Sequence, residues 1–283
     1  MLRYEIVDVF TDRPFAGNPL AVVFGADGLA DAQFQAVARE FNLSETAFVL
    51  PPVAGGDYRV RIFTPAAELP FAGHPSVGTA TTLVRLGQLG AGDLVQECGA
   101  GNLPVAATAS AARLTGGTPR IGAELDPAPL LAAVGLTADD HTGPAPRLAG
   151  CGIDSVHLAV RPDALARVDL DVAALRRTGH TLSVSAWDPA GRSARTRVFA
   201  ADLGVPEDPA TGSAALAYGV FLVATGLLPA TGDHRYTVRQ GVEMGRPSTL
   251  DCTVTAADGA AVAATVSGQV APVAVGELQI PPA

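Results

Sequence analysis

The chain has 283 residues, of which 48% are apolar and 17% charged, a composition typical of a compact globular protein with a substantial core. The formal net charge is -9 and no run of Lys or Arg occurs, so nucleic acids and anionic membrane surfaces are poor partners. Three widely separated cysteines form no zinc-type spacing and no disulfide framework, and the N-terminus lacks the apolar run of a signal peptide. We therefore expect a cytoplasmic protein without a metal site.

The first half of the chain alternates short strands with two helices. Apolar side chains at i, i+3, i+4 and i+7 from Phe34 to Phe41 predict an amphipathic helix that Asp31 caps and that stops near Asn42. A second helix is expected to open at residues 73–76 and to reach about residue 86, with Pro75 in its first turn. Alternating or apolar runs predict strands at residues 4–10, 21–24, 46–50, 58–64, 94–97 and 103–108.

The second half repeats this order of elements. Residues 61–64 (RIFT) are echoed by residues 197–200 (RVFA), and each run is followed by a loop and a helix that starts at a glycine. The corresponding elements are strands at 156–160, 182–187, 196–200, 236–239 and 250–254, helical structure at 163–177 and a loop at 201–209. An internal duplication of this kind predicts an α+β fold with two pseudo-symmetric lobes, each with strands wrapped around one apolar helix. We place the lobes at residues 1–118 and 119–267, with a returning strand at about 268–283 that completes the first.

The stretch at residues 207–228 contains the apolar helix of the second lobe. No charged residue lies between Asp208 and Asp233, so this segment is either a membrane span or a helix buried on all sides. Gly219, Gly226 and Pro229 interrupt it and favour the buried helix. Its polar N-terminus would offer free N–H groups to an anion, and a pseudo-twofold arrangement would turn both helix N-termini toward a cleft between the lobes.

Three ionisable side chains are candidates for proton transfer. Glu45 lies at a helix-to-strand junction among apolar neighbours, where desolvation would raise the pKa of its carboxyl; the alternative is a solvated loop glutamate. His74 follows the first helix-start glycine and either binds a substrate oxygen or is a satisfied histidine at a helix end. Asp208 either contacts substrate or merely starts a turn before Pro209.

Two further residues invite a chemical interpretation that we do not favour. Ser213 lacks the Gly-x-Ser-x-Gly frame of an activated nucleophile, so its hydroxyl and the N–H groups of Gly212 and Ser213 suit carboxylate binding instead. Cys98 lies in a glycine-rich run that the repeat places in the turn after the first central helix, which favours a structural role.

Several motifs, in this order, resemble those of the PhzF-like isomerases of phenazine biosynthesis over nearly the whole chain. The matching segments are Asp8-Val9-Phe10-Thr11, Gly17-Asn18-Pro19, Asn42-Leu43-Ser44-Glu45-Thr46, Arg61-Ile62-Phe63-Thr64-Pro65, Gly73-His74, Glu207-Asp208-Pro209-Ala210-Thr211-Gly212-Ser213, Gln240-Gly241 and the ending at residues 268–278.

The resemblance implies a diaminopimelate epimerase-like fold, in which each lobe is a β-barrel-like sheet around its central helix, in a homodimer that needs no cofactor. It further implies that Glu45 transfers a proton on a small carboxylate such as trans-2,3-dihydro-3-hydroxyanthranilate, with His74 and Asp208 as hydrogen-bonding and relay groups. Substrate binding would fall to Asn18, Gly73, Gly212 and Ser213.

Other functions of the same fold remain open. The paired cysteines of the related racemases are absent, because Gly73-His74 and Gly212-Ser213 stand in their places. An epimerase of amino acids would then have to use Glu45 and Asp208, and a non-catalytic binding protein would keep the cleft without proton chemistry.

Overall fold

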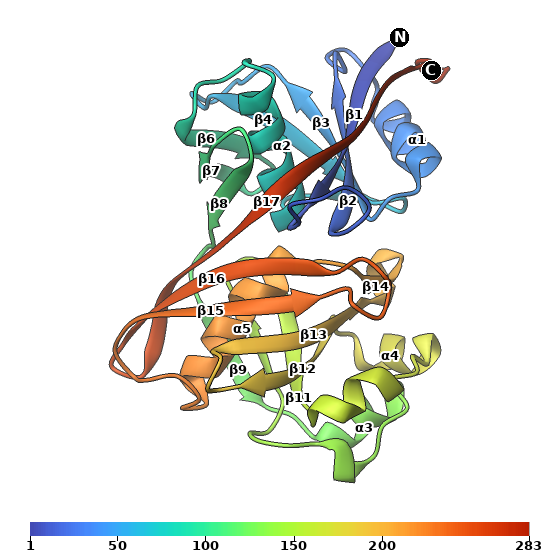
Figure 1. The fold of residues 1–283 in the computed structure, drawn as a ribbon. Coiled ribbons are helices and arrows are strands. Elements are labelled where there is room, and N and C mark those ends of the chain that lie inside the picture. The colour runs from blue at the N-terminus through green and yellow to red at the C-terminus, as the bar shows by residue number, and fades with distance from the viewer. Residues whose placement is uncertain (283) are drawn as a thin grey trace. The chain divides into compact units, whose positions relative to one another are not determined.

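The computed structural model describes residues 1–282, which divide into two compact units. Unit 1 comprises Met1–Thr115 together with the residues from Ser267 onward, and unit 2 comprises Gly116–Val266. Each unit wraps its strands around one helix, α2 in unit 1 and α5 in unit 2 (Figure 1). This confirms the predicted α+β fold with two pseudo-symmetric lobes.

Unit 1 begins with an alternation of strands and helices. Its elements are β1 (Leu2–Val9), β2 (Asn18–Phe24), α1 (Asp31–Phe41), β3 (Glu45–Leu50), β4 (Tyr58–Phe63), β5 (Glu68–Leu69), α2 (Gly73–Arg85), β6 (Gly92–Cys98), β7 (Gly101–Ala107) and β8 (Ala111–Thr115). The last strand of the chain, β17 (Ala260–Leu278), pairs antiparallel with β1 from Leu2↔Leu278 to Val9↔Val270. The circuit β17–β1–β2–β3–β4–β6–β7–β8 returns to β17, so eight strands close a barrel.

The two helices of unit 1 use different surfaces. α2 is buried from Gly73 to Leu83, as expected for a helix that fills a barrel, whereas α1 buries one face only. On that face Phe34 packs edge-on against Phe48 and stacks on Phe63, with ring centroids 4.8 and 5.6 Å apart. α1 ends as predicted, because Asn42 adopts the left-handed conformation that terminates helices.

Unit 2 is built from the same kinds of element. Its elements are β9 (Arg120–Glu124), α3 (Pro127–Ala133), the 3-10 turn Ala138–Asp140, β10 (Arg147–Gly150), β11 (Asp154–Ala159), the 3-10 turn Pro162–Arg167, α4 (Val172–Thr178), β12 (Leu182–Asp188), β13 (Ser193–Ala200), the 3-10 turn Ala201–Leu203, β14 (Val205–Asp208), α5 (Gly212–Ala224), β15 (Gly232–Gln240) and β16 (Ser248–Ala257). The strands pair in the order β9–β10–β11–β12–β13–β15–β16, with β14 attached to β13.

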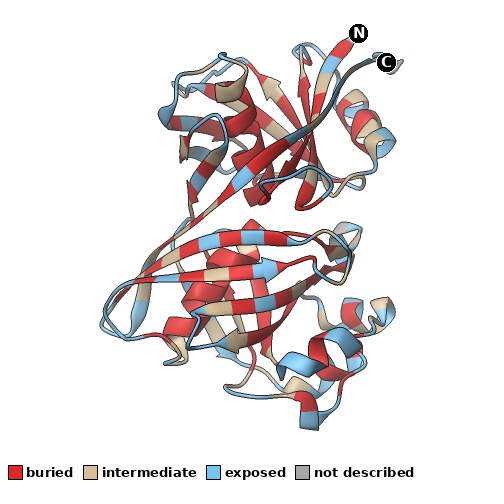
Figure 2. Cartoon of the chain, viewed as in Figure 1, coloured by how far each residue is buried: buried red, intermediate tan, exposed pale blue. Residues whose placement is uncertain are grey.

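α5 is the central helix of unit 2 and is buried almost end to end (Figure 2). Leu216, Val220 and Phe221 are among its buried side chains, and its contacts include β9, β10, β11 and β16. With 13 residues it is short, and none of the helices in residues 1–282 combines the length and apolar character needed to cross a membrane. The burial of this helix by its own unit confirms the interpretation made from its sequence.

The duplication is visible in the strand pairing and in two ion pairs. β2 pairs parallel with β3 and β4 with β6, just as β11 pairs parallel with β12 and β13 with β15. Arg61 on β4 forms two hydrogen bonds with Glu68 on β5, and Arg197 on β13 forms two with Glu207 on β14. Each pair fastens the short strand that leads into a central helix, which explains why the RIFT and RVFA runs echo one another.

Some local predictions were wrong. The loop expected after residues 61–64 and the one expected at 201–209 each contain a short strand, β5 and β14, because these segments pair with β4 and β13. Asp31 lies inside the first turn of α1, and the N-cap residue is Ala30. The elements between residues 111 and 150 were not predicted at all.

Candidate active site

The four predicted site residues of unit 1 lie at the starts of three elements. Asn18 is the first residue of β2 and Glu45 the first of β3, and the parallel register Leu20↔Glu45 brings these strand starts to the same end of the barrel. Gly73 and His74 open α2. The barrel therefore gathers side chains that are 56 residues apart in the sequence, Asn18 and His74, into direct contact.

The contacts among these side chains are specific. Nδ1 of His74 lies 3.2 Å from Oε2 of Glu45 and 3.3 Å from Nδ2 of Asn18. The hydroxyl of Ser44 donates to Oδ1 of Asn18 over 3.0 Å. The side chains of Asn18 and His74 are 0% and 3% exposed, whereas that of Glu45 is 15% exposed. Glu45 is thus the ionisable side chain of the cluster with the greater access to solvent.

The hydrogen bonds define which nitrogen of His74 accepts. Because Oδ1 of Asn18 receives the Ser44 hydroxyl, the amide nitrogen faces His74, and an amide N–H can only donate. Nδ1 of His74 accepts from this amide in the neutral tautomer that carries its proton on Nε2. Burial lowers the pKa of His74 to about 3, against a hydrogen bond to the Pro19 backbone that acts in the opposite direction. The imidazole is neutral at physiological pH.

A neutral His74 changes the meaning of its contact with Glu45. The contact is not an ion pair near pH 7, because an ion pair would need a charged imidazolium. A protonated Glu45 carboxyl, however, can donate to the single Nδ1 lone pair in place of the Asn18 amide. The cluster can therefore accommodate a proton on Glu45 without placing a second charge in the buried interior.

The predicted site residues of unit 2 lie together where β14 meets α5. Asp208 is the last residue of β14 and is 8% exposed, and α5 starts at Gly212 with Ser213 in its first turn. The hydroxyl of Thr211 donates to Oδ2 of Asp208 over 2.5 Å. The first N–H groups of a helix have no partner within the helix and carry the positive end of its dipole, so this junction suits a carboxylate ligand.

The structure adds residues that the sequence interpretation did not name as site residues. Ser44 orients Asn18, and both Thr211 and Gln240 contact Asp208. All three stand inside motifs that we had recognised, directly beside or within reach of a named residue. Ser44 and Thr211 could have been noticed because they lie next to or near named residues in the sequence. The hydrogen bonds of Gln240 to a distant segment cannot be read from a single sequence.

Cys98 is not part of either cluster. It is the last residue of β6, opposite Gly101 of β7, one strand further along than the turn in which we had expected it. Burial raises the pKa of its thiol, which keeps the sulfur protonated and unreactive near neutral pH. Both observations fit a structural role.

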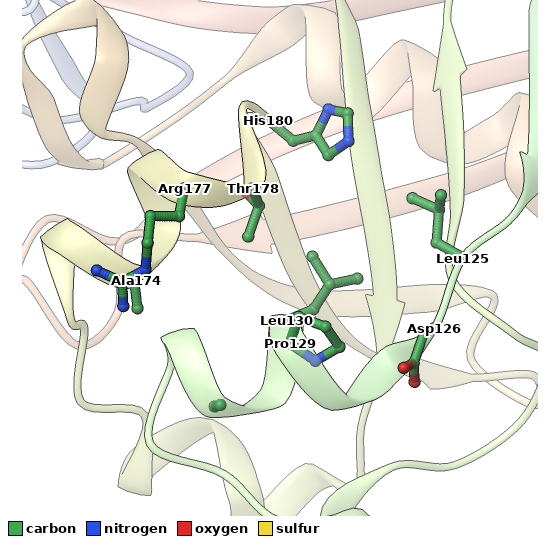
Figure 3. Close-up of a pocket in the computed structure, with 9 residues that line it drawn as sticks. Leu125, Asp126, Pro129, Leu130, Ala174, Arg177, Thr178 and His180 are labelled. Atoms are coloured by element: carbon green, nitrogen blue, oxygen red, sulfur yellow. The ribbon is translucent and has the colours of Figure 1, made fainter.

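A separate hollow of about 420 Å³ lies on unit 2 between α3 and α4 (Figure 3). Leu130 and Pro129 of α3 form its apolar part, and His180 and Arg177 lie on the α4 side. None of the predicted site residues lines this hollow. The predicted acid–base residues lie instead in the two residue clusters described above.

The family of the chain follows from its match to known proteins. The family model PhzC-PhzF, described as phenazine biosynthesis-like protein, matches residues 7–276. The chain belongs to this family. It is 37% identical over 281 residues to the trans-2,3-dihydro-3-hydroxyanthranilate isomerase of Pseudomonas aeruginosa, with 95% of this chain and 96% of that protein covered. An uncharacterized isomerase of Mesorhizobium japonicum is 38% identical, with coverage of 98% and 99%.

Solved structures agree with this assignment. A predicted epimerase from Pseudomonas aeruginosa has 35% sequence identity and a TM-score of 0.81, with 98% of this chain and 99% of that chain covered. A PhzF-family protein of Bacillus anthracis superposes with a TM-score of 0.88 over 99% of both chains at 24% identity, which shows the common fold. The chain is accordingly an isomerase of the PhzF family.

Proposed function

We propose that this chain isomerises a small cyclic carboxylate by moving one proton, with Glu45 as the acid and base. Trans-2,3-dihydro-3-hydroxyanthranilate, on which the relative in Pseudomonas aeruginosa is named to act, is the first candidate substrate. The observation that carries the proposal is the contact of the partly exposed Glu45 carboxyl with the buried, neutral His74 over 3.2 Å. It provides a proton carrier with access to ligand and a partner suited to its protonated form.

The proposed reaction is balanced within one molecule of substrate. The Glu45 carboxylate removes a proton from one ring carbon, the electron pair shifts along the allylic system, and the resulting carboxylic acid returns the proton to a second carbon. One carboxylate suffices if it reaches both carbons from the same face. While Glu45 holds the proton, Nδ1 of His74 can accept a hydrogen bond from it, and Asn18 keeps the imidazole in place. No cofactor enters this scheme.

We further propose that polar groups of both units bind the substrate. Asn18 and Gly73 would contribute from the unit 1 cluster, and Asp208, Gly212 and Ser213 from the start of α5. The N-terminal N–H groups of the two central helices support this proposal, because such groups favour a carboxylate. Hydrogen bonds to the developing anion would also acidify the allylic proton.

We propose that the protein is a homodimer and that it is located in the cytoplasm. The dimer comes from the resemblance to the family, whereas the cytoplasmic location comes from the composition of the chain. Light scattering coupled to size exclusion tests the first point, since a dimer has twice the 28.7 kDa mass of the chain.

The decisive experiment follows proton exchange by NMR in D₂O. Wild type is expected to introduce deuterium into trans-2,3-dihydro-3-hydroxyanthranilate, or into another member of a panel of small cyclic acids and amino acids. Glu45→Gln removes the proton carrier and should reduce the exchange rate at least about 100-fold, in line with the usual contribution of general acid–base catalysis. Glu40→Gln, the same change at an exposed glutamate on α1, is the control and should exchange at the wild-type rate.

Each other outcome points to a different function. Exchange that persists in Glu45→Gln would move the acid–base role to His74 or Asp208 and overturn our assignment. Exchange at the α-carbon of an amino acid, with loss of optical rotation, would favour an epimerase, the reaction for which the 35%-identical neighbour is named. Saturable binding without any exchange would indicate a binding protein.

A further inference from the structure

Gln240 connects β15 to the segment that precedes α5. Its side chain is 1% exposed, and its amide makes three hydrogen bonds to that segment. Nε2 donates to the backbone oxygen of Asp208 over 2.7 Å and to Oγ1 of Thr211 over 2.9 Å, and Oε1 accepts from the backbone N–H of Thr211 over 3.1 Å. Two acceptors at one end and a donor at the other define the orientation of this amide.

The direction of these bonds determines where the Thr211 hydroxyl sends its proton. Because Oγ1 of Thr211 already accepts from Gln240, its own O–H is directed to another acceptor, and Oδ2 of Asp208 lies 2.5 Å away. An ionised carboxylate oxygen accepts this O–H more strongly than a protonated carboxyl does. The chain of hydrogen bonds from Gln240 through Thr211 to the accepting carboxyl of Asp208 therefore favours the ionised carboxylate and limits its rotation.

The backbone around Gln240 is built for a close approach to the same segment. Gly241 has φ +73°, and a Cβ atom there would lie 2.6 Å from the carbonyl oxygen of Pro209 and 2.3 Å from that of Arg246. The Ser248 hydroxyl also donates to the Pro209 carbonyl, over 2.8 Å. Ser248 thus braces the backbone of the segment. Gln240 binds the Asp208 backbone and the Thr211 hydroxyl, and that hydroxyl in turn donates to the Asp208 side chain.

We propose that Gln240 and Thr211 are positioning residues that hold Asp208 as an oriented, ionised hydrogen-bond acceptor. The catalytic role of this arrangement rests on the proposed function. An ionised Asp208 accepts a hydrogen bond from a donor on the substrate. The substrate is therefore an acid that also carries an amino or hydroxyl group. The positioning itself is a property of the free protein and can be tested without any substrate.

The first test is a carbon-13 NMR titration of the protein labelled at the carboxyl carbons of aspartate, with Asp208→Asn to assign the signal. Thr211→Val removes the hydroxyl and keeps the shape, and we expect it to raise the titration midpoint of Asp208 by about one pH unit, the usual value of one hydrogen bond to a charged group. Gln240→Leu should shift the midpoint in the same direction. Thr211→Ser restores the hydroxyl and should return the midpoint to the wild-type value.

Ser248→Ala is the matched control, because it removes a hydrogen bond to the same segment but none to the carboxylate. Its Asp208 midpoint should equal that of wild type. The proposal is overturned if Thr211→Val leaves the midpoint unmoved, or if Ser248→Ala shifts it equally. Circular dichroism checks that each variant is folded to the same extent as wild type. If Gln240→Leu is unfolded, the result for the isosteric Thr211→Val alone tests the proposal.

A kinetic test links this arrangement to turnover. We expect Thr211→Val to lower kcat/KM about tenfold and Ser248→Ala to change it less than twofold. In an Asp208→Asn background, Thr211→Val should have no additional effect, because one change removes the ionised acceptor and the other the donor of the same hydrogen bond. Full additivity would argue against positioning. If wild type turns over no acid at all, the proposed function fails while the titration still decides the role of Gln240 and Thr211.

Discussion

At the scale of single residues, two buried histidines have the same electrostatic character in different units. His74 belongs to the candidate site, and His157 on β11 lies inside unit 2, where Nε2 contacts the Ser155 hydroxyl over 3.1 Å and the ring lies beside Tyr218 and Phe221. Burial lowers the pKa of each to about 3. Both rings are neutral in the folded protein at a pH where an unfolded chain would protonate them.

This difference predicts a loss of stability in acid that His157 makes measurable. Between the unfolded pKa of about 6.5 and the folded pKa of about 3, the unfolded chain binds more protons, so stability falls as the pH falls through this window. At pH 5 the cost from His157 is roughly 2 kcal/mol relative to pH 7.5. Urea unfolding of wild type and His157→Gln at both pH values should show the variant gaining on wild type in acid. An equal difference at both pH values would contradict the prediction.

Residue-level prediction from the sequence reached its limit at contacts between distant segments. The importance of Glu45, His74 and Asp208 came from the order of motifs, whereas the contact of Asn18 with His74 depends on the packing of α2 against β2. The neutrality of His74 depends on burial that only the closed barrel creates. A single sequence specifies neither the packing nor the burial.

At the scale of elements, the long amphipathic and fully apolar segments were predictable and the short ones were not. α1 shows helical periodicity, and α5 is free of charge over its whole length. β9 is mostly exposed and so has no alternation to detect, whereas α3 does have a signal that we overlooked, since Asp126 caps it directly before Pro127. β5 and β14 are short strands that pair with β4 and β13, and an arginine on each of those neighbours also binds them, so both depend on contacts that lie outside their own sequence.

The two arginine pairs should differ in strength, because their burial differs. Arg197 and Glu207 are 11% and 18% exposed, and Arg197 also donates to the carbonyls of Leu165 and Val168. Arg61 is 25% exposed and Glu68 is 42% exposed, so solvent screens their pair. Arg197→Met should lower stability by about 2–4 kcal/mol and Arg61→Met by about 1 kcal/mol. Denaturant unfolding followed by circular dichroism measures both, and equal losses would refute the distinction.

At the scale of the whole molecule, the two units are assembled from the chain in different ways. Unit 2 is formed by one continuous segment, whereas unit 1 needs both ends of the polypeptide. The N- and C-terminal strands β1 and β17 run side by side in unit 1 (Figure 1). Without β17 the strand β1 would become an open edge, and the barrel around α2 would not close.

Removal of the residues from Ser267 onward should therefore unfold unit 1 and spare unit 2. Hydrogen–deuterium exchange read by mass spectrometry should show lost protection in β1 and α2, while α5 and β16 retain theirs, since β1 loses a partner along its full length. A shorter deletion from Gln279 onward lies beyond the paired register and serves as the control. Unchanged protection of β1 in the longer deletion would show that the strand is dispensable.

The position of β17 at the end of the chain also delays the completion of unit 1 during translation. A ribosome that adds about 5–20 residues per second needs roughly 10–30 s to synthesise the approximately 150 residues of unit 2, which separate Thr115 from Ser267. During that interval the first 115 residues have emerged without their closing strand, and β1 offers an unpaired edge to any neighbouring polypeptide. The half of the protein that is translated first is thus the half that finishes folding last, which makes that interval the time when chaperone binding would protect it most.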